Sequence, residues 1–314
     1  MLELKDVSKI YRVGTFGGKE LHAVNHVSFK VNDGEVVSLI GESGSGKSTI
    51  GKMVLRLLSI SSGQILFDQK NITEYRGNSL KEYYRKVQGV FQDPFGSYNP
   101  IFKADRIFSV IHEEFFPGVD KSTWDSKVCS SLASVGLNPE HVLDKFPHQL
   151  SGGQLQRFLI ARALLLESHF LVADEIISML DASTRIDVLN LLADLKKRSF
   201  SVLFITHDLS LGYYISEQAV ILYRGCVVEM GKTEMIYGHP LHPYTQMLMK
   251  SIPRIDGRWE DLGSEADRCV ARDSLIGCPY YARCTAAMPG KCDKDRPSLM
   301  EVEEGHSVAC WLYQ

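Results

Sequence analysis

A glycine-rich loop between an apolar run and a helical pattern is the feature that most constrains the fold of this chain. Residues 41–48 read G-E-S-G-S-G-K-S, which fits the pattern G-x-x-x-x-G-K-[ST]. The preceding residues 35–40 form an apolar run that predicts a buried strand. A helix is predicted over 47–58, because its apolar side chains recur on one face: Ile50, Met53, Val54, Leu57 and Leu58. A strand, a glycine loop and a helix in this order are typical of a phosphate-binding site.

The residue types in the loop suit the binding of a nucleotide. Glycines let the backbone curl so that its N–H groups point at phosphate oxygens, and the following helix presents the positive end of its dipole. Lys47 would add a full charge near the β- and γ-phosphates, and the Ser48 hydroxyl would bind Mg²⁺, which prefers oxygen ligands. The alternative is a glycine-rich turn that binds nothing, and the flanking strand and helix argue against it. The predicted nucleotide-binding residues of the loop are Gly41, Ser43, Gly44, Ser45, Gly46, Lys47, Ser48 and Thr49.

Further apolar runs predict the rest of an α/β core. Residues 170–173 and 201–205 are short, apolar and followed at once by polar residues, as interior strands of a mostly parallel sheet would be. Between them the pattern predicts a helix over 186–197. The stretch from about 105 to 166 has helical patterns and no strong strand signal, so we interpret it as a helical insertion. At residues 250–253 the composition shifts to Gly, Pro, Asp, Glu and Cys, which marks a candidate boundary to a small tail.

The composition argues against several classes of protein. The 314 residues are 44% hydrophobic and 23% charged, which is ordinary for a globular chain with a large core. No run of about eighteen apolar residues could span a bilayer, and the first residues lack the basic and apolar regions of a secretory signal. We therefore expect the protein to stay in the cytosol and to reach a membrane only through a partner protein. A formal net charge of -3 argues against a dedicated nucleic-acid surface, so we expect no nucleic-acid partner.

A second anion-binding pattern lies downstream of the loop. Residues 150–154 read L-S-G-G-Q and are followed by a helical run. A Ser-Gly-Gly turn at a helix start can aim backbone N–H groups and a hydroxyl at a γ-phosphate, although alone it is more often a plain cap. The run resembles the signature of ATP-binding cassette (ABC) proteins. In that family the signature faces the phosphate loop of another subunit, so the resemblance implies that four residues complete a partner's site: Ser151, Gly152, Gly153 and Gln154.

Two further segments resemble motifs of the same family. Residues 91–94, F-Q-D-P, are similar to its Q-loop. This likeness implies that Gln92 reaches the metal and the attacking water and reports to the membrane domain. Residues 170–175, F-L-V-A-D-E, are similar to its Walker B strand. There the resemblance implies that Asp174 holds Mg²⁺ through water and that Glu175 polarises the nucleophilic water.

Three single positions extend the resemblance. Residues 179–181 are similar to the family's D-loop with Asp181, and His207 stands where the family has its switch histidine. Tyr11 sits where the family places the aromatic ring that stacks on adenine, although alone it would be ordinary strand packing. Each motif is weak in isolation, since a lone His is usually structural. Their order and context support the interpretation, which implies Glu175, His207, Gln92 and Lys47 as catalytic residues and Ser48, Gln92 and Asp174 as Mg²⁺ ligands.

The resemblance also implies a fold and an activity. The expected fold is an α/β cassette of the P-loop NTPase class, with a mostly parallel core sheet, an antiparallel β subdomain, a helical subdomain over about 95–165 and a small Cys-rich C-terminal module. We expect the nucleotide-binding domain to cover 1–236 and the C-terminal extension to cover 237–314. The implied activity is hydrolysis of ATP with Mg²⁺. The metal, Lys47 and His207 would neutralise the γ-phosphate while Glu175 orients water.

One segment departs from the family pattern. The family usually reads E-P-T-S-A-L-D where residues 175–181 read E-I-I-S-M-L-D. Ile176 and Ile177 therefore replace a rigid turn residue and a hydroxyl beside the γ-phosphate. We expect the site still to hydrolyse ATP, though less efficiently. A nucleotide-gated subunit without useful turnover is a rival that this segment leaves open, whereas Glu175 and His207 argue against it.

Two stretches are similar to one branch of the family. Residues 87–100 and 239–245 resemble the importers of dipeptides and oligopeptides, a group that also serves nickel. His239 and His242 could form a metal site, but the flanking prolines favour a helix start.

That branch implies a set of partners and a location. The partners would be a homologous ATPase subunit, two membrane-spanning permease subunits and an extracytoplasmic substrate-binding protein. The chain would be peripheral, at the cytoplasmic face of the cell membrane. The alternatives are a nickel or other small-solute importer, an exporter ATPase, and a stand-alone cassette of translation or repair.

The cysteines predict a metal site in the tail. Five of the seven cysteines lie beyond residue 268, and in a reducing cytosol such clustering suggests metal rather than disulfides. Four of them lie in a stretch too short to build a core: Cys278, Cys284, Cys292 and Cys310. Their spacing is neither that of a zinc ribbon nor that of a ferredoxin. Likeness to the tails of peptide importers favours a structural [4Fe-4S] cluster, with Zn²⁺ and free buried thiols as the alternatives.

Overall fold

Two sheets form the framework of the chain. The computed structural model describes residues 1–14, 18–178, 180–251 and 276–314. The larger sheet has eight strands in the order β11-β12-β10-β9-β3-β8-β7-β6. Its parallel strands are β3 (Val36–Ile40), β6 (Val87–Val90), β7 (Phe170–Asp174), β8 (Ser201–Thr206) and β9 (Gln218–Tyr223). Its antiparallel edge adds β10 (Cys226–Lys232), β11 (Met300–Glu303) and β12 (His306–Val308).

The smaller sheet is antiparallel and lies over the first helix. Its order is β2-β1-β4-β5, with β1 (Leu2–Val13), β2 (Lys19–Val31), β4 (Ser62–Phe67) and β5 (Lys70–Asn71). Helix α1 (Lys47–Val54) buries Ile50 and Met53 in a core that contains side chains of both sheets. The helix therefore lies between the two sheets, and the loop before it is held from both sides.

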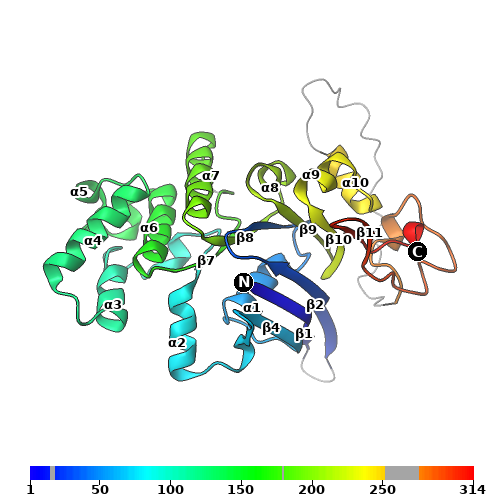
Figure 1. Cartoon of the computed structure of the whole chain (residues 1–314), viewed down its shortest axis with the longest axis horizontal. Coiled ribbons are helices and arrows are strands. Elements are labelled where there is room, and N and C mark those ends of the chain that lie inside the picture. Colours follow the sequence, from blue (N-terminus) through cyan, green and yellow to red (C-terminus); the bar gives the residue numbers. More distant parts are fainter. Residues whose placement is uncertain (15–17, 179, 252–275) are drawn as a thin grey trace.

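Four of the other helices form a subdomain at one end of the molecule (Figure 1). The subdomain contains α3 (Arg106–Phe115), α4 (Lys121–Ser134), α5 (Pro139–Val142) and α6 (Gly152–Leu165). Its core continues under α7 (Ala182–Lys197) and the strands β6 to β8. The remaining helices are α2 (Gly77–Lys86), α8 (Leu209–Ile215), α9 (Thr233–Gly238) and α10 (Pro243–Lys250).

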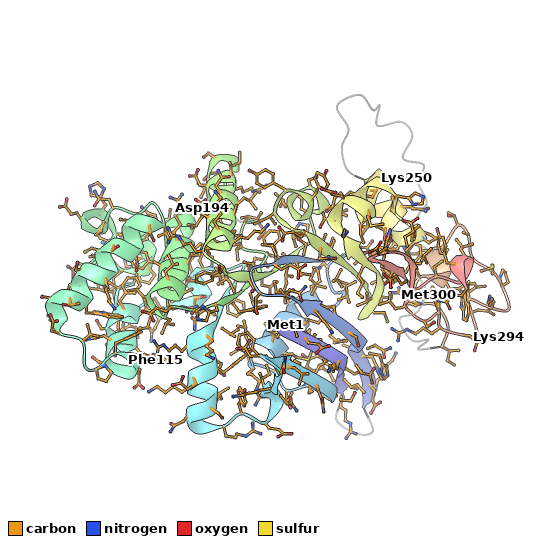
Figure 2. The ribbon with its side chains drawn as sticks, in the orientation of Figure 1. Met1, Phe115, Asp194, Lys250, Lys294 and Met300 are labelled. Carbon is orange, nitrogen blue, oxygen red and sulfur yellow. The ribbon has the colours of Figure 1, made fainter. Side chains whose placement is uncertain are left out.

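The tail lies at the opposite end of the molecule from the helical subdomain. Figure 2 shows Lys294 and Met300 of the tail at the same end of the molecule as Lys250 of α10, and Phe115 of α3 towards the other end. The tail does not form a separate layer, because β12 pairs with β10 and so extends the large sheet. Within the described parts of the chain, we find no helix with the length and apolarity needed to cross a bilayer.

A buried carboxylate joins the tail to the large sheet. Glu229 of β10 has no exposed surface, and its two oxygens accept the backbone N–H groups of Leu241 and His242 at 2.8 and 2.9 Å. His306 Nε2 of β12 lies 2.7 Å from the same carboxylate. A buried charge of this kind is stable only when its lone pairs are satisfied, so these three contacts depend on one another.

The predicted fold class is confirmed, while two helix boundaries differ from the prediction. Helix α1 ends at Val54 and not at residue 58, because Arg56 adopts a left-handed φ of 56° that stops the helix. Helix α7 begins at residue 182 and not at 186, because the Asp181 side chain accepts the Thr184 N–H and caps the helix earlier. The periodicity of apolar residues indicates which face of a helix is buried, but it does not determine where the helix begins and ends.

Of the two histidines beside the prolines, His242 starts a helix, as the sequence indicated, whereas His239 is the C-cap of the preceding helix α9. His242 is the N-cap of α10, where its Nδ1 accepts the backbone N–H of Tyr244 at 3.0 Å and Pro243 follows as the first helical residue. His242 is 1% exposed, and this burial lowers its pKa to about 4. The neutral imidazole is therefore the form that the folded chain stabilises.

The free energy of unfolding should fall as the pH drops from about 6.5 towards about 4. Across that range the unfolded chain binds a proton on His242 and the folded chain does not, which costs about 3 kcal/mol in total. His242→Asn keeps a cap acceptor and removes the titration, so its unfolding free energy should depend less on pH in chemical denaturation. His239→Asn, on an exposed histidine, is the matched control. Equal pH dependence in His242→Asn and the wild type would contradict the assignment.

Candidate nucleotide site

The glycine loop follows β3 and requires glycine at two close approaches. Gly46 has a φ of 103°, and a Cβ there would lie 2.3 Å from the carbonyl oxygen of Ala23 in β2. A Cβ at Gly41 would lie 2.2 Å from the carbonyl oxygen of Leu222 in β9. Since real side chains cannot occupy such distances, only glycine lets the loop sit against both sheets.

Lys47 already points into the loop. Its Nζ donates to the carbonyl oxygens of Gly41 and Glu42 at 2.7 and 2.9 Å. The residue is 4% exposed, and burial lowers the pKa of its ammonium group. A cation desolvated in this way interacts strongly with any anion that enters the loop.

The ends of the neighbouring parallel strands bring further polar groups to the same edge. Ser48 Oγ of α1 donates to Asp174 Oδ1 at the end of β7, at 3.1 Å. Asp174 is 6% exposed, and burial raises the pKa of its carboxyl group. A hydroxyl and a carboxylate are hard oxygen donors of the kind that Mg²⁺ takes together with phosphate oxygens. Gln92 follows β6, the strand next to β7, and its side chain is exposed.

Glu175 and His207 follow β7 and β8 and contact each other. His207 Nδ1 lies 3.2 Å from Glu175 Oε1. Glu175 has a left-handed φ of 49°, and its N–H donates to the carbonyl oxygen of Ile205 at 2.9 Å. Non-glycine residues in this region of backbone space often mark functional sites. The two side chains line a cavity of about 140 Å³ together with Ile177, Arg185 and Thr206.

The pair that departs from the family pattern is part of the hydrophobic core. Ile176 is fully buried and Ile177 is 3% exposed, and both pack in the cluster that underlies α6 and α7. The two isoleucines therefore anchor the segment after Glu175 to the core beneath α6 and α7.

The signature residues form a capping box at the exposed start of α6. Ser151 Oγ accepts the N–H of Gln154 at 3.2 Å, and Gln154 Oε1 accepts the N–H of Ser151 at 2.8 Å. A Cβ at Gly152 would lie 3.7 Å from Pro94, which places the turn beside the segment after Gln92. Gly153 packs against Thr184 of α7, where a Cβ would approach to 2.7 Å. The signature and the phosphate loop thus belong to different subdomains of one chain.

Two other predicted residues lie near the edge of this region. Asp181 caps α7 through the Thr184 N–H at 3.0 Å, and hydrogen bonds from Ser183 and Thr184 lower its pKa. Met179, its neighbour in the predicted D-loop, lies outside the described residues. Tyr11 of β1 is half-buried, and Lys9 Nζ lies 5.2 Å from the centre of its ring. The ring therefore has a cationic neighbour in the strand.

The predicted four-cysteine metal site is not present as a formed ligand set. Among the described residues, no group of three or more His, Cys, Asp or Glu side chains is close enough to hold a metal ion. Cys278 and Cys284 are half-buried thiols, while Cys292 and Cys310 are buried. Burial raises the pKa of Cys278 to about 11, and the other three cysteines add to the effect. The four cysteines are therefore not arranged as metal ligands in the described structure, and the assembly of a ligand set is coupled to metal binding.

The C-terminal extension makes two contacts with the loop that the sequence analysis did not predict. Tyr244 Oη of α10 accepts the backbone N–H of Glu42 at 3.0 Å. Arg283 Nη1 donates to both carboxylate oxygens of Glu42, at 3.1 and 3.0 Å. Nothing in the local pattern around Glu42 indicates partners more than two hundred residues away. Only the packing of the tail against β9 and β10 brings these groups together.

Comparison with known proteins assigns this arrangement to a family. The model of the ABC transporter family matches residues 24–178, and the model of the oligopeptide/dipeptide transporter C-terminal region matches residues 228–292. The oligopeptide transport ATP-binding protein OppF of Streptococcus mutans is 41% identical over 257 residues, which cover 82% of each chain. The chain belongs to the ABC transporter family.

Two further comparisons support the assignment of this ABC protein. The oligopeptide transport ATP-binding protein AppF of Bacillus subtilis is 39% identical over 329 residues, covering 100% of this chain and 97% of that protein. A solved dimer of the ATP-binding cassette MJ0796, in a post-hydrolysis state bound to ADP and Pi, has a TM-score of 0.67 and 28% identity. It covers 74% of this chain and 99% of that chain. The resemblance inferred from the motifs, including its peptide-importer branch, is confirmed.

Restoring the family's usual pair after Glu175 should raise the turnover of ATP. Ile176→Pro with Ile177→Thr returns the rigid turn and a hydroxyl beside the γ-phosphate, which is the physical reason for the gain. Steady-state phosphate release by the purified complex measures it. Since both isoleucines are buried, the variant should also lose roughly 1–3 kcal/mol of stability, so the rate is compared per folded protein. An unchanged rate would show that the departure is neutral.

Proposed function

We propose that this ABC protein is the ATP-binding and ATP-hydrolysing subunit of an importer for dipeptides and oligopeptides. The observation that supports it most is the meeting of Lys47, Ser48, Asp174, Glu175 and His207 at the carboxyl edge of the parallel strands. In open α/β sheets, ligands bind at this edge. The names of its relatives OppF and AppF favour oligopeptides as cargo. A nickel or other small-solute importer is the alternative.

Each residue has a proposed role in hydrolysis. The glycine loop binds the phosphates through its backbone N–H groups, and Lys47 exchanges its contacts with Gly41 and Glu42 for the β- and γ-phosphates. Ser48, Gln92 and Asp174 would hold Mg²⁺, which would supply positive charge to the phosphate oxygens. Glu175 orients the attacking water. His207 contacts the Glu175 carboxylate and stabilises charge on the γ-phosphate. Tyr11 stacks on adenine, and Asp181 belongs to the D-loop.

Two ATPase subunits are proposed to share each site. The signature begins with the exposed Ser151 at the start of α6, where Gly152 and Gln154 are partly exposed and Gly153 is buried, and it belongs to a different subdomain from the loop. A second, homologous ATPase subunit would supply its signature to this chain's loop and receive the signature of this chain in return. The dimeric form of the solved cassette supports this arrangement.

An exposed groove of mixed polarity is the proposed docking surface for a permease subunit. The groove, of about 440 Å³, is lined by apolar side chains that include Ile101, Phe102 and Val110, and by charged ones that include Lys103, Asp105, Arg106 and Glu113. Ile101 is 76% exposed, and Phe102 and Val110 beside it are also exposed. Exposed apolar side chains that lie together often mark a protein–protein interface. Docking there would hold the chain at the cytoplasmic face of the cell membrane, while an extracytoplasmic protein delivers the cargo.

The four tail cysteines are proposed to bind a structural [4Fe-4S] cluster, with Zn²⁺ as the alternative. Neighbouring cysteines, Cys292 among them, contribute to raising the pKa values of Cys278, Cys284 and Cys310, so the four side chains lie near one another. Thiolate ligands suit either metal.

Hydrolysis should depend on the complex and on two residues of this chain. In the complex, Lys47→Ala and Glu175→Gln should each lower ATP turnover about a hundredfold or more, because each removes a group that acts on the γ-phosphate or the water. Glu140→Gln, the same change at an exposed position, is the control. The isolated wild-type chain should hydrolyse ATP slowly. A full rate from the isolated chain would contradict the shared site.

Metal analysis of anaerobically purified protein tests the tail. About four iron and four sulfide per chain are expected. Cys278→Ser should lower both, whereas Cys129→Ser, at an exposed cysteine of α4, should leave them unchanged. Zinc without iron would exclude the cluster and support the alternative. The absence of both would exclude a metal site.

A further inference from the structure

Glu42, the second residue of the phosphate loop, is held through all three of its polar parts. Its carbonyl oxygen accepts from Lys47 Nζ at 2.9 Å, within the loop itself. Its N–H donates to Tyr244 Oη at 3.0 Å, and its carboxylate receives two hydrogen bonds from Arg283 Nη1. Two of the three partners therefore come from the C-terminal extension.

The extension presents Tyr244 on a rigid aromatic base. Tyr244 has no exposed surface, and its ring packs 4.6 Å from Tyr223 of β9 and 5.4 Å from Tyr280, measured between ring centres. Tyr223 and Tyr280 also meet edge to face at 5.1 Å. Figure 1 shows α10 beside β9 and β10. The hydroxyl that meets Glu42 is therefore fixed by the large sheet and the tail together.

Arg283 is presented by a tight turn of the tail. The turn begins at Cys278, whose carbonyl oxygen accepts the Tyr281 N–H at 3.0 Å, and the Arg283 N–H donates to the Tyr280 carbonyl oxygen at 3.0 Å. The guanidinium carbon lies 5.9 Å from the centre of the Tyr280 ring. The arginine thus reaches the loop from a short, internally bonded segment.

The ion pair between Arg283 and Glu42 neutralises a negative charge in the phosphate loop. ATP brings several negative charges to the loop, and the carboxylate of Glu42 belongs to that loop. Unpaired, it would repel the incoming phosphates; paired with Arg283, it contributes little net charge. The pair is about 40% exposed on each side, and surface ion pairs contribute little to folding stability. Its main effect should therefore fall on the loop and on nucleotide binding.

We propose that Arg283 and Tyr244 are positioning residues, by which the C-terminal extension shapes the phosphate loop and sets its affinity for ATP. Arg283 neutralises Glu42, and Tyr244 holds the backbone of Glu42 in place. The inference rests on the proposed function, since it requires that the loop bind ATP. It gives the extension a direct part in nucleotide binding.

Equilibrium binding of a fluorescent ATP analogue to the purified full-length chain tests the proposal. Arg283→Gln should raise the Kd about five- to tenfold, because an unpaired Glu42 then faces the phosphates. Tyr244→Phe should raise it about two- to tenfold, through loss of one hydrogen bond to the loop. Lys291→Gln, the same loss of charge within the tail but away from the loop, should bind as the wild type does.

A double variant separates positioning from a general loss of structure. In a Glu42→Gln background the repulsive carboxylate is gone, so adding Arg283→Gln should change the Kd less than twofold. Arg283→Lys keeps the positive charge and loses the planar set of guanidinium donors, so its Kd should lie between those of Arg283→Gln and the wild type. The Tm of Arg283→Gln should match the Tm of Lys291→Gln. A structural defect would instead lower the Tm of Arg283→Gln, and its effect on the Kd would persist in the Glu42→Gln background.

The outcomes for the two proposals are distinct. If the wild-type chain does not bind the analogue, the proposed function fails. If the wild type binds and Arg283→Gln binds equally well, or if its effect is as large in the Glu42→Gln background, the positioning role is overturned while the proposed function stands.

Discussion

The parallel pairing of β3 with β8 on one side and β9 on the other is the constraint on which the site depends. This register ends the strands at one edge of the sheet, so the glycine loop follows β3 where Glu175 and His207 follow β7 and β8. The loop can lie against this edge because Gly41 and Gly46 leave room for the carbonyls of β9 and β2. Charged groups then gather where backbone N–H groups are free to meet an anion, and burial makes their interactions stronger.

The tail of the chain belongs to this framework. Glu229 carries a buried charge whose oxygens are satisfied by the start of α10 and by His306 of β12, so the tail strands are tied to the large sheet. Once α10 is fixed there, its Tyr244 reaches the phosphate loop, and the following turn brings Arg283 to Glu42. A segment that is distant in sequence thereby becomes part of the environment of the nucleotide site.

Much of the fold and site could be predicted because the relevant signals are local. The glycine loop, the strand before it and the buried runs of β7 and β8 each lie within a few consecutive residues. Helix ends were less certain, since α1 stops where Arg56 turns left-handed while the apolar period continues. The cysteine pattern indicated a formed metal site, whereas the described residues contain no group of three or more His, Cys, Asp or Glu side chains placed to hold a metal ion. The spacing of cysteines along the sequence indicates which side chains could bind a metal, but it does not determine the distances between them in the folded chain.

By itself, the sequence determined the family, the phosphate loop, the order of the motifs and the presence of the buried strands, because each depends on residue type and short-range spacing. Tertiary structure alone decided which of these residues meet. It brought His207 to Glu175, buried Ile176 and Ile177 in the core, separated the signature from the loop, and set Arg283 and Tyr244 on Glu42. These contacts arise from the packing of segments distant along the chain, for which no local pattern carries information.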